Sequence, residues 1–233
     1  MGPGFRGPTP KQLNTDGRDL GPKESGKWFV SHQRAGELQG QLDGTRVVSV
    51  ADREGDCFEL LADAQQAGAA DILVRAQHAR KLAGGGRLMD HLDAQPQQGE
   101  IERHVPARGN QPARTARMAV RFDRVTVTPP TGKGNLAPVT LDAVRTTEID
   151  PPAGIRPLAW TLLTTVATET VAEAQERIQW YTARWQIEVY HRTFKSGCRV
   201  EDRQLGHADR LEACLAIDLI VGWRVFWLTK WAR

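Results

Sequence analysis

Cysteine is scarce in this chain, and its three cysteines stand far apart. Cys57, Cys198 and Cys214 form no CxxC pair. This spacing argues against a disulfide framework and against a zinc ribbon. We therefore expect a protein of a reducing compartment, the cytoplasm.

Long apolar runs are also absent. The most apolar stretch, residues 211–229, is interrupted by Glu212, Asp218 and Arg224, so a buried helix is favoured over a membrane span. The N-terminal sequence MGPGFRGPTPKQ holds no apolar segment that could act as a signal sequence. We expect no membrane partner.

A strong charge of either sign is missing as well. The net charge of +3 and the pI near 8.9 permit contact with phosphate without requiring it. Basic residues nevertheless concentrate in residues 101–133, where only Glu102 and Asp123 are acidic. This segment is either a solvated sheet face or a phosphate-binding surface. Its basic residues are Arg103, Arg108, Arg114, Arg117, Arg121, Arg124 and Lys133.

The order of the expected elements predicts an α/β protein. Glycine and proline fill residues 1–22 without a period, which predicts a disordered N-terminal segment. Residues 23–76 read as helix, strand, helix and strand, the pattern of a parallel α/β core. These elements are expected over residues 24–42, 45–52, 55–66 and 70–76.

The remainder of the chain is expected to be β-rich and then helical. Residues 77–157 show no helix periodicity and predict a β-rich insertion, with strands near 116–128 and 137–149. Residues 158–233 predict a last strand at 158–165 and C-terminal helices. Thr170 and Glu173 have the spacing of a capping box, and Gly197 supplies a stop, so one long helix is expected between them. Asp209 and Glu212 repeat the start signal for a final helix that reaches about residue 229.

The long helix carries two different faces. On a wheel of about 100° per residue, Trp180, Ala183, Ile187, Tyr190 and Phe194 form an apolar face. Opposite them lies a stripe that combines a tyrosine, cations and one acid. It is either an ordinary charged surface with an i,i+4 ion pair, or a surface that follows a phosphodiester backbone. The stripe consists of Tyr181, Arg184, Glu188, Arg192 and Lys195.

The spacing Tyr181-x2-Arg184-x3-Glu188-x6-Lys195 resembles the Tyr-Arg-Glu-Lys signature of bacterial cut-and-paste transposases of the insertion-sequence-four type. Two further blocks resemble the same family: VADREGD at residues 50–56 and WTLLT at residues 160–164. The similarity covers about residues 22–233. The family belongs to the DDE superfamily, so the resemblance implies an RNase H-like core, here partial.

That resemblance implies metal-dependent DNA chemistry. In the family, two metal ions, normally Mg²⁺, are held by two aspartates and one glutamate and activate water or a 3′ hydroxyl for attack on DNA phosphate. Asp52 matches the second aspartate and Glu188 the glutamate, so both are implied as catalytic and metal-binding residues. Without the family, Asp52 would be interpreted as a helix-start residue, so its functional role depends largely on the resemblance.

The resemblance also implies a set of DNA contacts. Tyr181, Arg184 and Lys195 match positions that hold transposon-end DNA. Trp160 matches an aromatic residue that stacks on a base turned out of the duplex, although a place in the sheet core is the alternative. Arg75, in the strand after Asp52, is a further candidate for DNA contact.

One departure limits the resemblance. The family's first aspartate lies on a strand upstream of Asp52, but Asp16, Asp19 and Asp43 do not close a β-branched run. The N-terminal DNA-binding domain and the dimerising helices of the family are not recognisable either. We therefore expect a truncated transposase that does not cleave DNA alone.

The sequence is therefore compatible with three hypotheses about function. The first is a partial transposase that acts on double-stranded DNA, as a homodimer in the family, in the bacterial cytoplasm and associated with the nucleoid. The second is a residual DNA-binding protein without catalysis. The third is an α/β interaction module whose affinity for DNA would not depend on Arg184 or Lys195.

Overall fold

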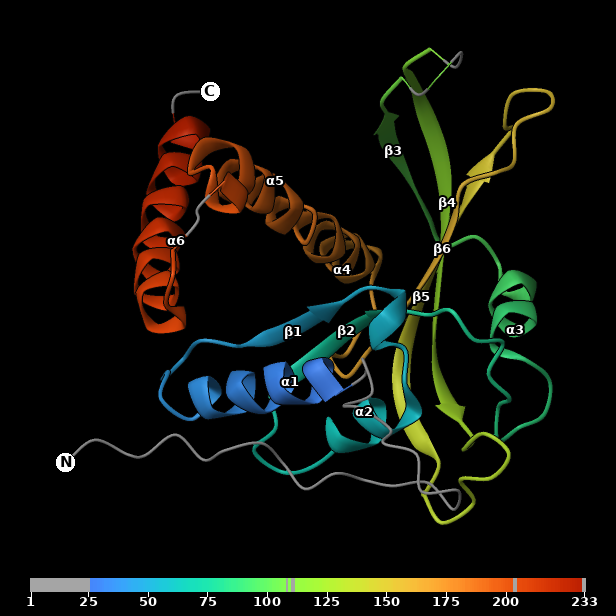
Figure 1. Cartoon of the computed structure of the whole chain (residues 1–233). Helices are drawn as coiled ribbons and strands as arrows, with labels where there is room; N and C mark the ends of the chain where they lie inside the picture. Colours follow the sequence, from blue (N-terminus) through green and yellow to red (C-terminus); the bar gives the residue numbers. More distant parts are fainter. Residues whose placement is uncertain (1–25, 108, 110–111, 203–204, 232–233) are drawn as a thin grey trace. The chain divides into compact units, whose positions relative to one another are not determined.

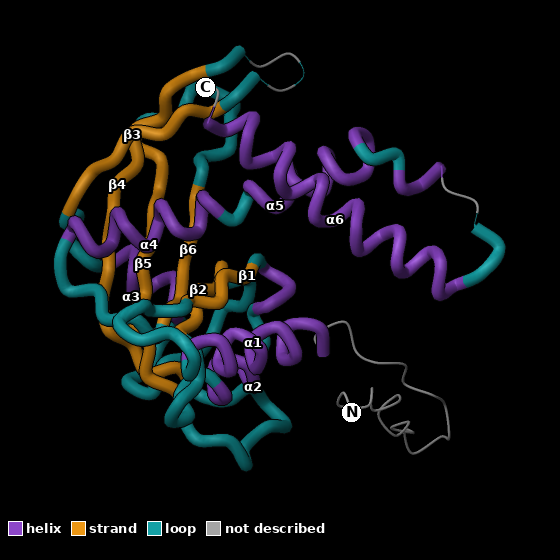
Figure 2. The backbone as a smooth tube through the Cα atoms, turned by 90° about the vertical axis from the view of Figure 1, so that its left-hand side faces the viewer, coloured by secondary structure: helices purple, strands orange, loops and turns teal. Residues whose placement is uncertain are grey.

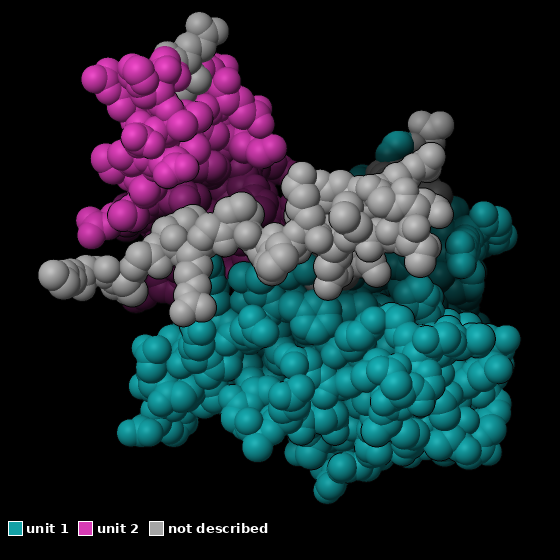
Figure 3. Space-filling model, turned by 60° about the horizontal axis from the view of Figure 1, so that its bottom comes forward, with its two compact units in different colours: residues 1–178 teal, residues 179–233 magenta. Residues whose placement is uncertain are grey.

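A computed structural model describes residues 26–107, 109, 112–202 and 205–231. The expected disordered segment at residues 1–22, the basic residue Arg108 and the candidates Asp16 and Asp19 lie outside this part. The chain divides into two compact units, residues 1–178 and residues 179–233 (Figure 3).

Unit 1 is built on one six-stranded sheet (Figure 1). The strand order is β1-β2-β6-β5-β4-β3. Only β1 and β2 pair in parallel, and every other neighbouring pair is antiparallel. The strands are β1 (Val48–Ala51), β2 (Asp71–Arg75), β3 (Gly99–Val105), β4 (Arg114–Val127), β5 (Val139–Ile149) and β6 (Ala159–Thr164).

Helices pack the main core against one face of this sheet. Ile72 and Leu163, from neighbouring strands, are fully buried there. They belong to a cluster that includes Phe58, Leu61 and Leu88 from the helices. Since these side chains lose all contact with water, their burial is the main stabilising contribution in unit 1. The helices are α1 (Gly26–Gln39), α2 (Phe58–Asp63) and α3 (Leu88–Ala94).

The opposite face carries α4 (Val171–Ala183), which Figure 2 shows crossing the strands. Its first residue is in close contact with β3, because a Cβ atom added to Gly99 would lie 2.5 Å from a methyl of Val171. The expected capping box is confirmed at the start of α4. The backbone N–H of Glu173 donates to Thr170 Oγ1 (3.2 Å), and that of Thr170 donates to Glu173 Oε2 (2.9 Å).

The structure confirms an α/β fold with C-terminal helices, including the parallel pair expected in residues 23–76. Two elements were not predicted. The helix α3 and the strand β3 both lie in the segment for which no helix was expected. The strands of residues 77–157 also join the same sheet as β1, β2 and β6.

Unit 2 pairs a short helix with a long one. Tyr190 stacks near Phe194 and donates its hydroxyl to the carbonyl of Leu219 (2.9 Å). Gly222 lies against Phe194, with 3.7 Å between the ring and the position of a Cβ atom. The elements of unit 2 are α5 (Gln186–Arg192), a π-helical turn (Thr193–Gly197), a 3₁₀ turn (Val200–Asp202) and α6 (Ala208–Trp231).

The single long helix expected between Thr170 and Gly197 is wrong. The helix is interrupted by a turn at Arg184 and Trp185, where the hydrogen bonds tighten to i→i+3. The backbone N–H of Ile187, for example, donates to the carbonyl of Arg184 (3.0 Å). The prediction that the apolar face of this helix is buried is also wrong in part, because Ile187 is 43% exposed and Ala183 is exposed. A tightened turn explains this, since it changes the rotation per residue that the wheel assumes.

No helix within the described ranges has both the length and the apolar character needed to cross a bilayer. All three cysteines are free thiols, in agreement with the expectation that they form no disulfide framework.

Candidate nucleic-acid interface

Trp160 is the centre of a cation and aromatic cluster on the α4 face of the sheet. It stands near the start of β6, opposite Thr146 of β5. The guanidinium carbon of Arg103 lies 4.2 Å from its ring centroid and that of Arg75 lies 5.7 Å from it. Both distances are within the range of cation–π attraction, about 6 Å. We call Arg75, Arg103 and Trp160 the Trp160 cluster.

The strands explain why these residues meet. Arg75 is the last residue of β2 and pairs with Leu162 of β6, so its side chain shares the sheet face of Trp160. Arg103 reaches the same ring from β3, the edge strand at the opposite end of the strand order from β1. The structure therefore brings together two residues that the sequence predicted as DNA contacts. It adds a third, Arg103, which the sequence placed only in a basic segment.

Most other basic residues of residues 101–133 are already paired. Arg114 forms an ion pair with Glu148, and Arg117 one with Glu100. Arg121 donates to Thr147 Oγ1 (3.0 Å). Because carboxylates compensate Arg114 and Arg117, and Lys133 likewise pairs with Glu59, a solvated face describes most of the segment better than a phosphate-binding surface. Arg103 lies over the aromatic ring of Trp160.

Two buried carboxylates on β5 lie on the same sheet face and have opposite pKa shifts. A hydrogen bond from Arg114 lowers the pKa of Glu148 below its ordinary value. Burial raises the pKa of Asp142, although the backbone N–H of Thr168 donates to it (3.2 Å). Arg124 is 3.9 Å from Asp142, which is too far for a strong ion pair. Arg114 thus compensates the charge of Glu148 at hydrogen-bonding distance, and Arg124 lies farther from Asp142.

Asp52 lies both at the end of a strand and at the start of a helical turn, the two positions expected for it. It directly follows β1, and its side chain also caps the 3₁₀ turn Arg53–Gly55 by accepting from the backbone N–H of Glu54 (3.0 Å). The helix-start reading of Asp52 is thus confirmed. Its role as a metal ligand stays a prediction.

The signature residues of the long helix all lie in unit 2. Tyr181 is 8% exposed, and the guanidinium carbon of Arg184 lies 5.8 Å from its ring centroid. Glu188 is exposed in the first turn of α5, and Lys195 forms an ion pair with Glu201 (3.1 Å). The structure thus brings Tyr181 and Arg184 together. It places Asp52, Arg75 and Trp160 in unit 1 and the signature residues in unit 2.

The two residues implied as metal ligands, Asp52 and Glu188, belong to different units. Within the described ranges, no three side chains of histidine, cysteine, aspartate or glutamate gather in an arrangement that could hold a metal ion. Two-metal chemistry needs several such ligands in one rigid site. The metal centre implied for Asp52 and Glu188 stays a prediction.

No model of a known protein family matches the chain.

Proposed function

We propose that this chain binds double-stranded DNA through the Trp160 cluster and does not cleave it alone. The observation that carries the proposal is the position of two guanidinium groups on one aromatic ring. Arginine held against a ring keeps its N–H donors in a fixed plane, and a phosphate can accept from that plane. Phosphate contacts supply most of the affinity of proteins for DNA.

The cluster supports phosphate contact better than base stacking. The guanidinium group of Arg103 lies 4.2 Å from the centroid of the Trp160 ring, at stacking distance. A base that stacks directly on Trp160 would have to displace that group. DNA that contacts Arg75 and Arg103 from outside would leave the cluster intact.

We further propose a relation to transposases of the insertion-sequence-four type with an RNase H-like core. The signature of Tyr181, Arg184, Glu188 and Lys195 supports it, as does Asp52 directly after a strand of the parallel pair. In open sheets of this kind, ligands gather at the carboxyl ends of the strands. Since no aspartate upstream of Asp52 closes a β-branched run and matches the family's first catalytic residue, binding rather than cleavage is the activity proposed for this chain.

Fluorescence anisotropy with a labelled duplex at several salt concentrations tests the binding. We expect the double variant R75A/R103A to weaken binding at least tenfold and to reduce the slope of log affinity against log salt by about 0.9 for each lost phosphate contact. Arg117→Ala is the matched control, because Arg117 is exposed but already paired with Glu100. Equal affinities of the double variant and wild type would contradict the proposal.

The absence of cleavage has its own test. Wild type and Glu188→Gln are incubated with a supercoiled plasmid and with Mg²⁺ or Mn²⁺, and nicking is followed on gels. We expect no metal-dependent nicking from either protein. Nicking by wild type that disappears in the Glu188 variant would establish a catalytic reading instead.

A further inference from the structure

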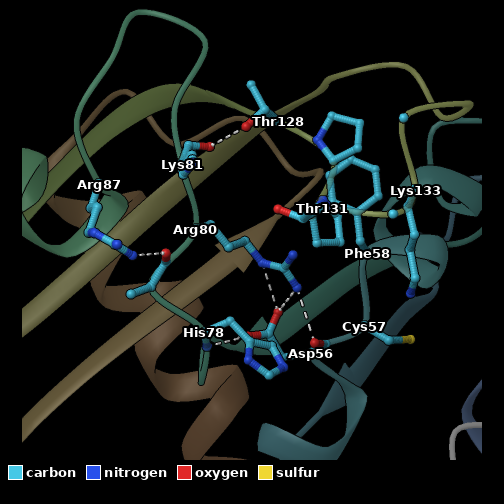
Figure 4. A pocket seen from close by; sticks show the side chains of 15 residues that line it. Asp56, Cys57, Phe58, His78, Arg80, Lys81, Arg87, Thr128, Thr131 and Lys133 are labelled. Atoms are coloured by element: carbon cyan, nitrogen blue, oxygen red, sulfur yellow. Dashed lines mark hydrogen bonds and ion pairs between the residues drawn. The ribbon is translucent and has the colours of Figure 1, made fainter.

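A cavity of about 690 Å³ opens in unit 1, away from the Trp160 cluster. Three segments line it: residues 56–58, residues 78–81 with Arg87, and residues 128–134. Figure 4 shows the side chains that face it. Its volume is within the range of about 300–1,000 Å³ that small-molecule sites occupy.

A buried ion pair forms part of the lining of this cavity. The side chains of Asp56 and Arg80 are 0% and 5% exposed and pair with each other (Figure 4). Asp56 also accepts from the backbone N–H groups of Gln77 (2.6 Å) and His78 (2.9 Å). The charge of Asp56 is therefore compensated by these three partners, and it adds little negative potential to the cavity.

Two cationic residues at directly opposite positions of a hairpin also line the cavity. Lys81 and Arg87 are antiparallel bridge partners in a small hairpin. Side chains directly opposite each other in such a pair are about 4.5–5.5 Å apart at Cβ, and like charges there are destabilising. Both residues line the cavity. Within the described ranges, no carboxylate forms an ion pair with either of them.

Hydrogen bonds fix the backbone of this hairpin and the guanidinium group of Arg87. The backbone N–H of Leu88 donates to the carbonyl of Arg80 (2.9 Å), and that of Thr128 donates to the carbonyl of Lys81 (2.9 Å). Arg87 Nη1 donates to the carbonyl of Ala79 (3.1 Å), which fixes its guanidinium group (Figure 4). The backbone positions of Lys81 and Arg87 are therefore held opposite each other, and an anion bound between their side chains would relieve the repulsion of the two charges.

The remaining lining gives a ligand an apolar side as well. Phe58 contributes its ring, and Pro129 and Pro130 lie in the third segment. Burial raises the pKa of the Cys57 thiol, so this group stays neutral at physiological pH and adds no charge. The cavity is thus lined by cations, Lys81 and Arg87, and by apolar residues that include Phe58.

We propose that the cavity binds a phosphomonoester of nucleotide size, with the phosphate between Lys81 and Arg87. The phosphate can come from a free nucleotide or from the end of a DNA strand, and both offer the same chemistry. The inference is independent of the Trp160 cluster, because none of the three cluster residues lines the cavity.

Isothermal titration calorimetry with adenosine 5′-monophosphate, adenosine and a 5′-phosphorylated oligonucleotide tests this site. We expect the monophosphate to bind and adenosine to bind at least tenfold more weakly. Binding of the 5′-phosphorylated oligonucleotide, but not of its unphosphorylated form, would identify a strand end as the source. Failure of both phosphorylated probes to bind would overturn the proposal.

Lys81→Glu separates a ligand site from a merely structural hairpin. It replaces a like pair by an opposite pair with Arg87, so the thermal midpoint of the free protein should rise while affinity for the monophosphate falls at least tenfold. Arg34→Glu is the matched control, because Arg34 is exposed on α1 and does not line the cavity. Unchanged monophosphate affinity of the Lys81 variant would contradict the site. Retention of nucleotide binding in R75A/R103A would show that it does not depend on the Trp160 cluster.

Discussion

Units 1 and 2 differ in where they place their apolar side chains. In unit 1 the large apolar residues are mostly inside, and Leu61, Ile72 and Leu163 have no exposed surface. In unit 2 most of them are outside, with Leu228 67% and Trp231 77% exposed. The two units nevertheless belong to one chain of ordinary composition.

The difference follows from the number of layers that each unit has. A sheet with helices on its faces can enclose side chains on both sides. Two helices alone cannot, and in α6 the buried residues are Asp218, Gly222 and Phe226. The apolar stretch at residues 211–229 was interpreted as a buried helix, and for most of its side chains this is wrong. We therefore expect unit 1 to carry most of the stability.

The largest effect is expected from the buried ion pair of unit 1. Arg80→Met leaves the charge of Asp56 buried without its partner, which costs about 3–5 kcal/mol. Urea unfolding, followed by hydrogen exchange of the sheet peptides, measures the loss. Lys27→Met is the control, because the ion pair of Lys27 with Glu54 is more than half exposed. Similar losses in both variants would show that burial does not govern this pair.

The same substitution in both units tests the comparison directly. Leu163→Ala removes a fully buried side chain of unit 1 and should cost about 2–5 kcal/mol. Leu228→Ala removes an exposed one of unit 2 and should change stability by less than about 0.5 kcal/mol. Urea midpoints of the two variants give the answer. A large loss from Leu228→Ala would mean that α6 is covered in solution.

A smaller, pH-dependent effect is expected within unit 1. The lowered pKa of Glu148 means that its stabilising contribution is present above the unfolded pKa of about 4.3. That contribution is lost as the pH falls through the lower, folded pKa. Glu148→Gln should therefore cost about 2 kcal/mol at pH 7 and less at pH 2. Urea unfolding at both values measures the difference.

Asp142 supplies the control of opposite sign. Burial raises the pKa of Asp142 in the folded state, so the ionised carboxylate lowers the stability of the fold. This destabilisation disappears as the pH falls through the folded pKa. Asp142→Asn should thus leave stability at pH 7 unchanged or higher. A loss at pH 7 equal to that of Glu148→Gln would contradict the assignment of burial as the cause of the shift at Asp142.

The sequence predicted the elements whose periodicity was strong. β4 and β5 were expected because they are long and rich in β-branched residues, and α4 began at the expected capping box. The helix α3 was missed because it is one of the shortest and has only Leu88 and Leu92 buried. The interruption at Arg184 and Trp185 could not be foreseen, since neither glycine nor proline marks it.

The candidate site was predictable only in part. Arg75 and Trp160 were named individually, but their contact depends on β2 and β6 being neighbours, which local patterns do not determine. Arg103 could have been found from β3, where alternate residues are half-buried and Arg103 shares the inner set with Ile101 and Val105. The like pair of Lys81 and Arg87 depends on a hairpin register that a run of three glycines only suggests.

The position of β6 between β2 and β5 also governs when the sheet can form. The backbone N–H of Ile72 donates to the hydroxyl of Thr165, which lies 93 positions later in the chain. At roughly 5–20 residues per second of synthesis, β2 waits about 5–20 s for its partner. During that interval one edge of β2 is unpaired, so the nascent chain is most open to misassociation before β6 emerges.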